Sequence, residues 1–118
     1  MMPNFNPANY SVRATKSVGN IVINSNTSNQ VLIAAANNLY TDLYGLFITN
    51  NSGTNTMVWI SDGTQAYPFY ASATQTSGFS FPAQASIPAT NANTAWTCNT
   101  STSVANVYIT ALFVKNNI

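Results

Sequence analysis

The sequence has no histidine, no glutamate and a single cysteine, Cys98, and only 4% of its 118 residues are charged. Without an imidazole, a serine or threonine nucleophile has no usual general base, and Cys98 has no partner that would lower the pKa of its thiol. The two carboxylates, Asp42 and Asp62, lie in no acidic loop with calcium-ligand spacing, and their settings are typical of aspartates that cap backbone amides. We therefore expect no enzyme activity, no metal and no cofactor.

The formal net charge of +1 gives no electrostatic field that would gather phosphates. We therefore expect neither nucleic acid nor a membrane as a partner. The missing catalytic groups go with the expectation of no small-molecule substrate. The N-terminus has neither the basic region nor the apolar run of a signal peptide, which predicts synthesis in a cytoplasm. Asn, Thr, Ser and Gln replace the missing charges, and these side chains lose little rotamer entropy on burial, which suits a protein packed in an assembly. A secreted domain adapted to an unusual solvent is the alternative.

The hydrophobic content of 46% is enough to bury a core in a single domain. Short runs rich in β-branched and aromatic residues recur along the chain, separated by clusters of Asn, Gly, Ser, Thr and Pro, as in an all-β sandwich. These runs cover residues 20–24, 29–36, 43–49, 55–61, 65–72, 77–82, 94–99 and 103–115. We predict an all-β fold, a compact antiparallel β-sandwich of the jelly-roll type over residues 19–118, with an extended N-terminal arm over residues 1–18.

The stretch LYGLFITNNSGTNTMVWISDGT predicts a hairpin, in which Leu43–Thr49 pairs antiparallel with Asn55–Ser61 around the corner at residues 51–53. Both strands are apolar on two faces, which favours burial between two layers, or between one layer and a neighbouring subunit. The run 103–115 has the same pattern and is predicted to be a central strand. Asp62-Gly63 marks the next turn.

Proline interrupts two later segments. Pro68 lies inside the run 65–72, which indicates an edge strand or an irregular one. The segment PAQASIPATNANT, residues 82–94, reads as a long loop of small residues, placed where it could drape over a neighbour.

Aromatic side chains are the main remaining resource for binding, although most of them are expected in the core. The candidate exposed group is Tyr67, Phe69 and Tyr70 near Trp96. We favour self-association as the role of this group, and a platform for carbohydrate is the alternative.

Residues 1–18 scatter aromatics among proline and asparagine with no period of 2 or 3.6, which is typical of an arm that anchors on another surface. The candidate anchors in this arm are Phe5, Tyr10, Arg13 and Lys16.

The order of the motifs NQVLIAAA, LYGLFITNNSGTNTMVWISDGT, SGFSFP and TAWTCNTSTSVANVYITALFV resembles that of the small all-β virion proteins of tailed bacteriophages. The resemblance covers residues 29–114 and is greatest for head decoration, or cement, proteins that trimerise on the capsid exterior. The motifs are turn and core signals, so they carry no catalytic residues over to this chain.

This resemblance implies a homotrimer that is made in the host cytoplasm, binds the major capsid protein from outside and stabilises the shell. In that layout the arm clamps the capsid or links neighbours. A receptor- or glycan-binding module of a phage tail fibre or spike is the alternative.

Overall fold

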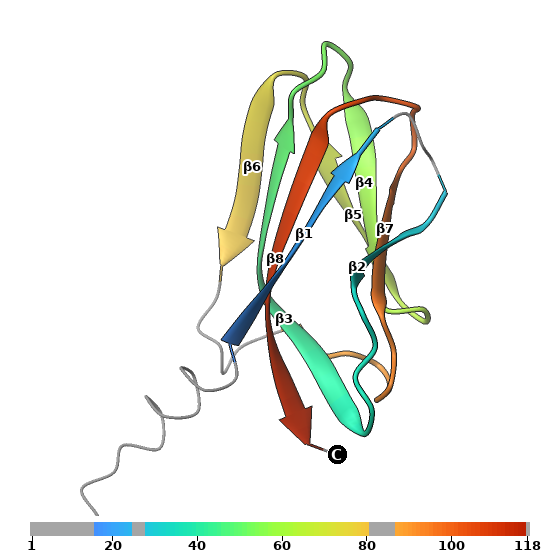
Figure 1. The fold of residues 1–118 in the computed structure, drawn as a ribbon. Coiled ribbons are helices and arrows are strands. Elements are labelled where there is room, and N and C mark those ends of the chain that lie inside the picture. The colour runs from blue at the N-terminus through green and yellow to red at the C-terminus, as the bar shows by residue number, and fades with distance from the viewer. Residues whose placement is uncertain (1–15, 25–27, 81–86, 118) are drawn as a thin grey trace, which may run out of the picture.

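The computed structural model describes residues 16–24, 28–80 and 87–117, and these residues form eight β-strands (Figure 1). No helix among these residues is long and apolar enough to cross a membrane. The strands are β1 (Lys16–Ile23), β2 (Gln30–Ile33), β3 (Leu39–Asn50), β4 (Thr56–Ser61), β5 (Ala66–Ala71), β6 (Gln75–Ser80), β7 (Trp96–Thr100) and β8 (Val107–Asn117).

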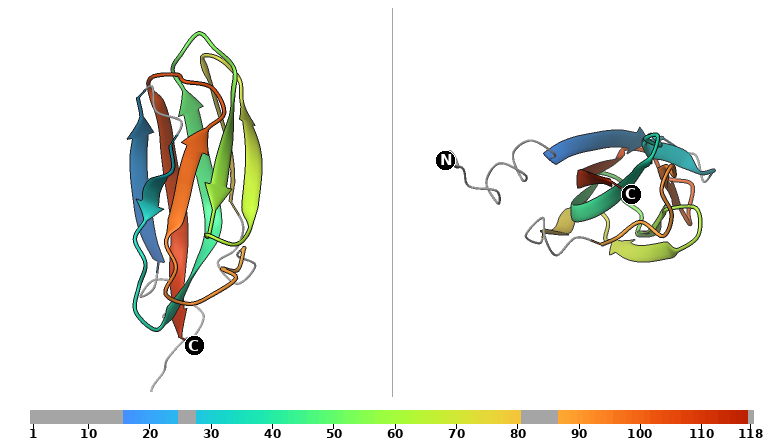
Figure 2. Two further views of the ribbon diagram at one scale, coloured as in Figure 1. Left: turned by 90° about the vertical axis from the view of Figure 1, so that its right-hand side faces the viewer. Right: turned by 90° about the horizontal axis from the view of Figure 1, so that it is seen from below.

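The strands form two four-stranded antiparallel sheets that pack face to face (Figure 2). Sheet A has the order β1-β8-β3-β6, and sheet B has the order β2-β7-β4-β5. Consecutive strands lie in different sheets at every step except β4 to β5, which is the arrangement of a jelly roll. The predicted fold class is therefore confirmed.

The core lies between the sheets and follows from period-two alternation along each strand. In β8, Val107, Ile109, Ala111 and Phe113 face inward and are almost fully buried, while Tyr108 is exposed on the opposite face. β8 lies between β1 and β3, so the prediction of a central strand is confirmed. The core consists of Ile23, Leu32, Ile33, Leu43, Leu46, Ile48, Val58, Ile60, Ala71, Ala89, Trp96, Cys98, Val104, Val107, Ile109, Ala111 and Phe113.

The predicted hairpin between residues 43–49 and 55–61 is wrong, because β3 belongs to sheet A and β4 to sheet B. Asn50 at the end of β3 is fully buried. Its Nδ2 donates to the carbonyl oxygens of Thr54, at 2.8 Å, and Ala71, at 3.0 Å, and its Oδ1 accepts from Ser52. These bonds direct the chain over the end of the core into the other sheet.

The hairpin that does form joins β4 to β5 through the predicted turn at Asp62-Gly63. Gly63 has a φ of 94°, which side chains rarely tolerate, and Oδ1 of Asp62 accepts hydrogen bonds from the amides of Thr64, at 2.9 Å, and Gln65, at 2.7 Å. β5 is an edge strand, as the position of Pro68 predicts.

At the N-terminus, β1 begins at Lys16, so residues 16–18 belong to sheet A and not to the predicted arm. Residues 1–15 lie outside the described part of the chain, together with the anchors Phe5, Tyr10 and Arg13.

Candidate interaction surfaces

The predicted exposed aromatic group does not exist as one surface. Trp96 is fully buried in the core, where its Nε1 donates to the carbonyl oxygen of Thr41 at 2.7 Å. Tyr67 is half-buried and stacks on Trp96, with ring centroids 6.3 Å apart. The prediction that Trp96 faces a ligand or subunit is therefore wrong, because a large ring in the middle of a sandwich strand fills the space between the two sheets.

Phe69 and Tyr70 lie on opposite faces of β5, since successive residues of a strand alternate. Phe69 is half-buried and stacks on Phe79 of β6, with ring centroids 5.6 Å apart. Tyr70 is 56% exposed, and of the predicted group it alone is open to solvent.

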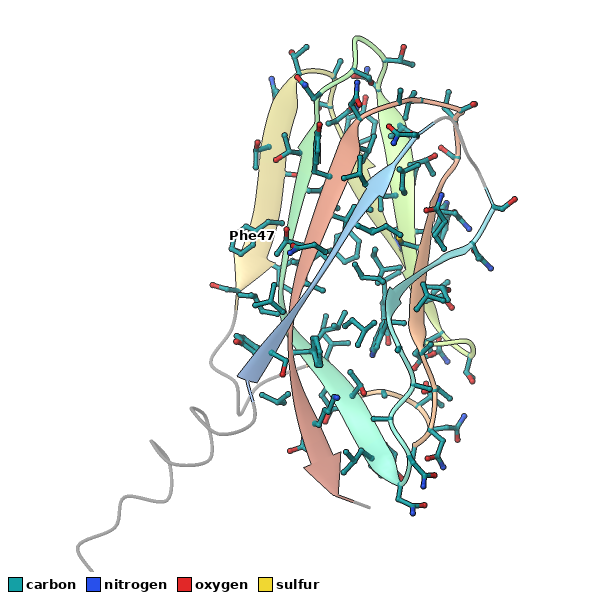
Figure 3. The ribbon with its side chains drawn as sticks, in the orientation of Figure 1. Phe47 is labelled. Carbon is teal, nitrogen blue, oxygen red and sulfur yellow. The ribbon has the colours of Figure 1, made fainter. Side chains whose placement is uncertain are left out.

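The outer face of sheet A carries four exposed apolar side chains, Val18, Val22, Phe47 and Tyr108. Figure 3 labels Phe47 among the side chains of the sandwich. The register places Val22, Tyr108, Thr49 and Thr76 in one row across the sheet; Asn20, Thr110, Phe47 and Gly78 in the next; and Val18, Leu112, Gly45 and Ser80 in the third. We call these three rows the sheet A face. They contain no charged residue, and Thr110 Oγ1 donates to Asn20 Oδ1 at 2.7 Å.

Two glycines flatten the sheet A face. A Cβ on Gly45 would lie 2.8 Å from Cδ1 of Leu112, and a Cβ on Gly78 would lie 2.7 Å from Cδ1 of Phe47. The Leu112 side chain therefore lies over Gly45, and the Phe47 ring leans toward Gly78. The apolar pattern on both faces of β3 and β8 was the sequence signal for this surface, although it did not identify Phe47 or Tyr108.

The outer face of sheet B carries a second set of exposed apolar residues, Val31, Trp59 and Tyr70. Trp59 of β4 pairs with Pro68 on one side and with Asn99 of β7 on the other. Asn99 Nδ2 donates to Asn29 Oδ1 at 2.5 Å, so amide groups lie beside the indole ring. Trp59 was not singled out by the sequence analysis.

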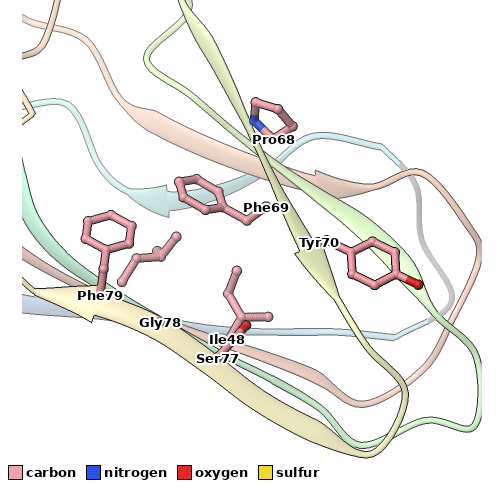
Figure 4. A pocket seen from close by; sticks show the side chains of 8 residues that line it. Ile48, Pro68, Phe69, Tyr70, Ser77, Gly78 and Phe79 are labelled. Carbon is pink, nitrogen blue, oxygen red and sulfur yellow. The ribbon is translucent and has the colours of Figure 1, made fainter.

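A groove of about 320 Å³ lies between the edge strands β5 and β6. It is lined by Leu46, Ile48, Pro68, Phe69, Tyr70, Ser77, Gly78 and Phe79. Figure 4 shows Phe69 and Phe79 pointing into the space between the two strands, while Tyr70 points away from it. No lining residue is charged.

Both carboxylates of the chain bind the segment 87–90. Asp42 Oδ1 accepts from the Ala89 amide at 2.7 Å, and its Oδ2 accepts from Asn116 Nδ2 at 2.6 Å. Asp62 Oδ2 accepts from the Thr90 amide at 2.7 Å. The expected capping role is therefore confirmed, although Asp42 lies within β3 and not in a turn.

The described part of segment 82–94 thus packs on its own chain, where Ile87 also bridges to Leu43 of β3.

The electrostatics of Asp62 agree with this structural role. Burial alone raises the pKa of its carboxyl group, but hydrogen bonds from Gln65, Thr90 and Thr64 outweigh it and hold the pKa below its ordinary value. Cys98 is buried in the core as a small hydrophobe, and this burial raises the pKa of its thiol to about 11. Within residues 16–24, 28–80 and 87–117, no three His, Cys, Asp or Glu side chains form a group that could hold a metal ion.

These features define the class of the molecule as a jelly-roll sandwich with few charged residues and with exposed apolar surfaces. No protein-family model matches the sequence. No curated protein matches it either. Among solved structures, the chain is similar to one in the cryo-EM structure of a virus-like particle of the extra small virus of the giant freshwater prawn Macrobrachium rosenbergii. The TM-score is 0.43 at 10% sequence identity, over 87% of this chain and 79% of that chain.

Proposed function

We propose that this chain is a structural protein of a virus particle, and more specifically a decoration or cement protein that binds the exterior of a tailed-bacteriophage head. The sheet A face is the observation that carries the proposal. It exposes Val18 at 58%, Val22 at 39%, Phe47 at 42% and Tyr108 at 43%, in three rows of the sheet that contain no charged residue. Val22 and Tyr108 are directly opposite each other on β1 and β8, and contiguous exposed apolar patches on a folded domain mark interaction surfaces.

The sheet A face fits a broad, flat partner better than a small ligand. Its apolar side chains are spread over β1, β8 and β3 with hydroxyl and amide groups between them. Gly45 and Gly78, which have no side chains, keep the surface flat. Covering each of these half-exposed side chains contributes about 1 kcal/mol. A single copy then binds weakly, and many copies on one shell add their contributions.

Decoration by such a protein needs no active site. Any protein that binds the assembled shell and not its dissociated subunits shifts the equilibrium toward the shell. Within this proposal the partner is the major capsid protein, the chain self-associates as a homotrimer, and it resides on the capsid exterior after synthesis in the host cytoplasm. We propose no catalytic activity.

The number of copies per particle tests the proposal directly. Quantitative mass spectrometry of purified virus particles measures this chain against the major shell protein. A ratio near one chain per shell subunit supports decoration. A few copies per particle indicate a tail or fibre component, and absence from the particle contradicts a virion role.

A surface variant tests the sheet A face itself. Val22→Ser/Tyr108→Ser removes two neighbouring apolar side chains from β1 and β8. We expect this variant to bind empty expanded shells about thirtyfold more weakly, and Tyr70→Ser on the opposite sheet to bind like the wild type. Equal binding of all three proteins would exclude the sheet A face as the docking surface.

The arm is a separate part of the proposal. Removing residues 1–15 leaves β1 complete and deletes the anchors Phe5, Tyr10 and Arg13. We expect the shortened protein to keep the unfolding temperature of the sandwich and to lose attachment to shells. Retained attachment would contradict an anchoring arm.

The sheet B face favours a second candidate function, that of a glycan-binding module of a tail fibre or spike. Trp59 and Tyr70 offer ring faces on which a sugar can stack, and Asn99 offers an amide beside Trp59. Binding of neutral oligosaccharides on a glycan array that is lost in Trp59→Ala and kept in Phe47→Ala would support this function. An array without signal would contradict it.

A further inference from the structure

We propose that strand β6 is a self-pairing edge, at which a second copy of this chain adds its own β6 antiparallel to form one continuous eight-stranded sheet. Within the described part of the chain, β6 pairs with β3 alone and forms an end of sheet A (Figure 1). Five of its six residues are exposed. This inference goes beyond the proposed function and does not depend on it.

The direction of the backbone groups of β6 follows from its contact with β3. A Cβ on Gly78 would lie 2.4 Å from the carbonyl oxygen of Leu46, so this oxygen points at β6. Leu46 is opposite Phe79, and antiparallel strands exchange hydrogen bonds at every second pair. The amides and carbonyls of Thr76, Gly78 and Ser80 therefore point away from β3, toward the open edge.

Nothing in the sequence of β6 blocks pairing at this edge. Proteins protect edge strands with proline, charged side chains or bulges. β5, the neighbouring edge of sheet B, carries Pro68, whereas QTSGFS has neither proline nor charge, and its pairing with β3 is regular. Among the described residues no other strand pairs with this edge, and six residues are long enough to form a ladder.

The chemistry of β6 selects a second copy as the occupant. A two-fold axis at Gly78 pairs Gly78 with its symmetry mate and Thr76 with Ser80, and these residues carry the outward-pointing backbone groups. A two-fold contact brings the same surface of both copies together, so charged side chains of one sign would repel each other. Neither β6 nor the lining of the groove contains a charged side chain.

The side chains on both faces of the joint are also self-complementary. On the outer face, Gly78 and its symmetry mate leave a gap, and the Phe47 ring of each copy leans toward it. An aromatic ring packed over a glycine is a known way to stabilise a sheet. On the inner face, Ser77 lies opposite Phe79 of the second copy, at the mouth of the groove between β5 and β6.

Charge substitution and sedimentation equilibrium of the full chain test this contact. In Thr76→Lys/Ser80→Lys, the two-fold axis places lysines directly opposite each other on exposed positions. We expect the wild type to form two-fold species, either dimers or hexamers built from trimers, and the lysine variant to dissociate about tenfold more readily. Thr54→Lys/Gln65→Lys adds the same charge in exposed turns and should associate like the wild type.

Variants with complementary charges provide the decisive test. Thr76→Glu/Ser80→Glu should also dissociate, and an equimolar mixture with the lysine variant should recover the two-fold species, because every lysine then faces a glutamate. Phe47→Ala, which leaves β6 unchanged, should weaken association as well. A wild type without two-fold species, a lysine variant that associates normally, or a mixture that stays dissociated would each overturn the proposal.

The oligomers separate this proposal from the proposed function. A wild type that binds shells as a trimer without two-fold species contradicts only the β6 pairing and leaves an extended segment of another protein as the occupant of the edge. Two-fold species in a protein that is absent from virus particles contradict only the virion role.

Discussion

The two sides of the sandwich differ in how closely the sheets approach each other. On one side, β1 of sheet A lies against β2 of sheet B, and a Cβ on Gly19 would come within 2.7 Å of the carbonyl oxygen of Leu32. On the other side, β5 and β6 stand apart around a groove of about 320 Å³. One side is closed by backbone contact, and the other keeps an apolar interior accessible.

The open side is itself divided into two parts. Alongside the first half of β3, which we call its lower half, the segment 87–90 closes the gap between the sheets. It does so through the bridge between Leu43 and Ile87 and through hydrogen bonds to the carboxylates of Asp42 and Asp62. Alongside the upper half, β6 continues the sheet and the groove remains. The chain therefore uses both of its acidic residues to close one part of this side and leaves the other part free of charge.

The largest effect is expected at the closed side. Gly19→Val places a branched side chain 2.7 Å from the Leu32 carbonyl oxygen and 3.1 Å from Cγ1 of Ile33, so the sheets must separate. We expect the free energy of unfolding to fall by about 3 kcal/mol, measured by chemical denaturation. Ser77→Val on the exposed, open side should change it by less than about 0.5 kcal/mol. Equal losses would show that the two sides do not differ in packing.

The open side is expected to depend on its aromatic pair. Phe69→Ala removes the ring that stacks on Phe79 at 5.6 Å and is half-buried, so we expect a loss of about 2 kcal/mol in the free energy of unfolding. Tyr70→Ala, its neighbour on the opposite face of β5, should stay within about 0.5 kcal/mol of the wild type. A Phe69→Ala protein as stable as the wild type would mean that the groove contributes nothing to the fold.

Local sequence patterns predict some parts of this fold and not others. The fold class, the central position of the final strand, the edge position of the Pro68 strand and the turn at Asp62-Gly63 all follow from local periodicity and turn chemistry. The placement of β3 and β4 in different sheets does not follow from the sequence, because a polar corner between two apolar runs is compatible both with a hairpin and with an arch between sheets. Burial of Asn50 decides between them, and burial is a property of the whole fold.

The candidate surfaces were harder to predict for a related reason. Composition indicates that some aromatics must be exposed but not which ones. Trp96 and Trp59 both lie in strand sequences, yet one is fully buried and the other is 38% exposed, because alternation fixes faces only once the register of each strand is known. The apolar residues on both faces of β3 and β8 were the clearest sequence signal of an interaction surface.

The contact of Asp62 with the segment 87–90 should make the free energy of unfolding depend on pH. The pKa of Asp62 is lower in the folded protein than its ordinary value, so its charged form stabilises the fold above that ordinary value. This contribution is lost as the pH falls through the lowered pKa. We expect Asp62→Asn to reduce the free energy of unfolding by about 1 to 2 kcal/mol at neutral pH.

The pH dependence of this loss is the control. As the pH falls below the ordinary pKa of 3.8, the unfolded chain takes up a proton at Asp62 before the folded protein does, so the difference in stability between wild type and Asp62→Asn should shrink until the pH has passed the lowered folded pKa. Thermal unfolding followed by circular dichroism across this range measures it. A difference that stays constant with pH would assign the loss to the altered turn and not to the charge.

The smallest effect is expected in the buried interior near the start of β3. Thr41 is 1% exposed, and its Oγ1 has no hydrogen-bond partner among the described residues. Because a buried hydroxyl without a partner costs free energy, Thr41→Val should raise the free energy of unfolding by up to about 1 kcal/mol. Thr100→Val is the matched control, since Thr100 is equally buried but its Oγ1 donates to the Thr102 carbonyl oxygen at 2.8 Å. This second variant should be destabilised by about 1 kcal/mol, and opposite signs for the two threonines would establish that the closed part of the sandwich excludes water from Thr41.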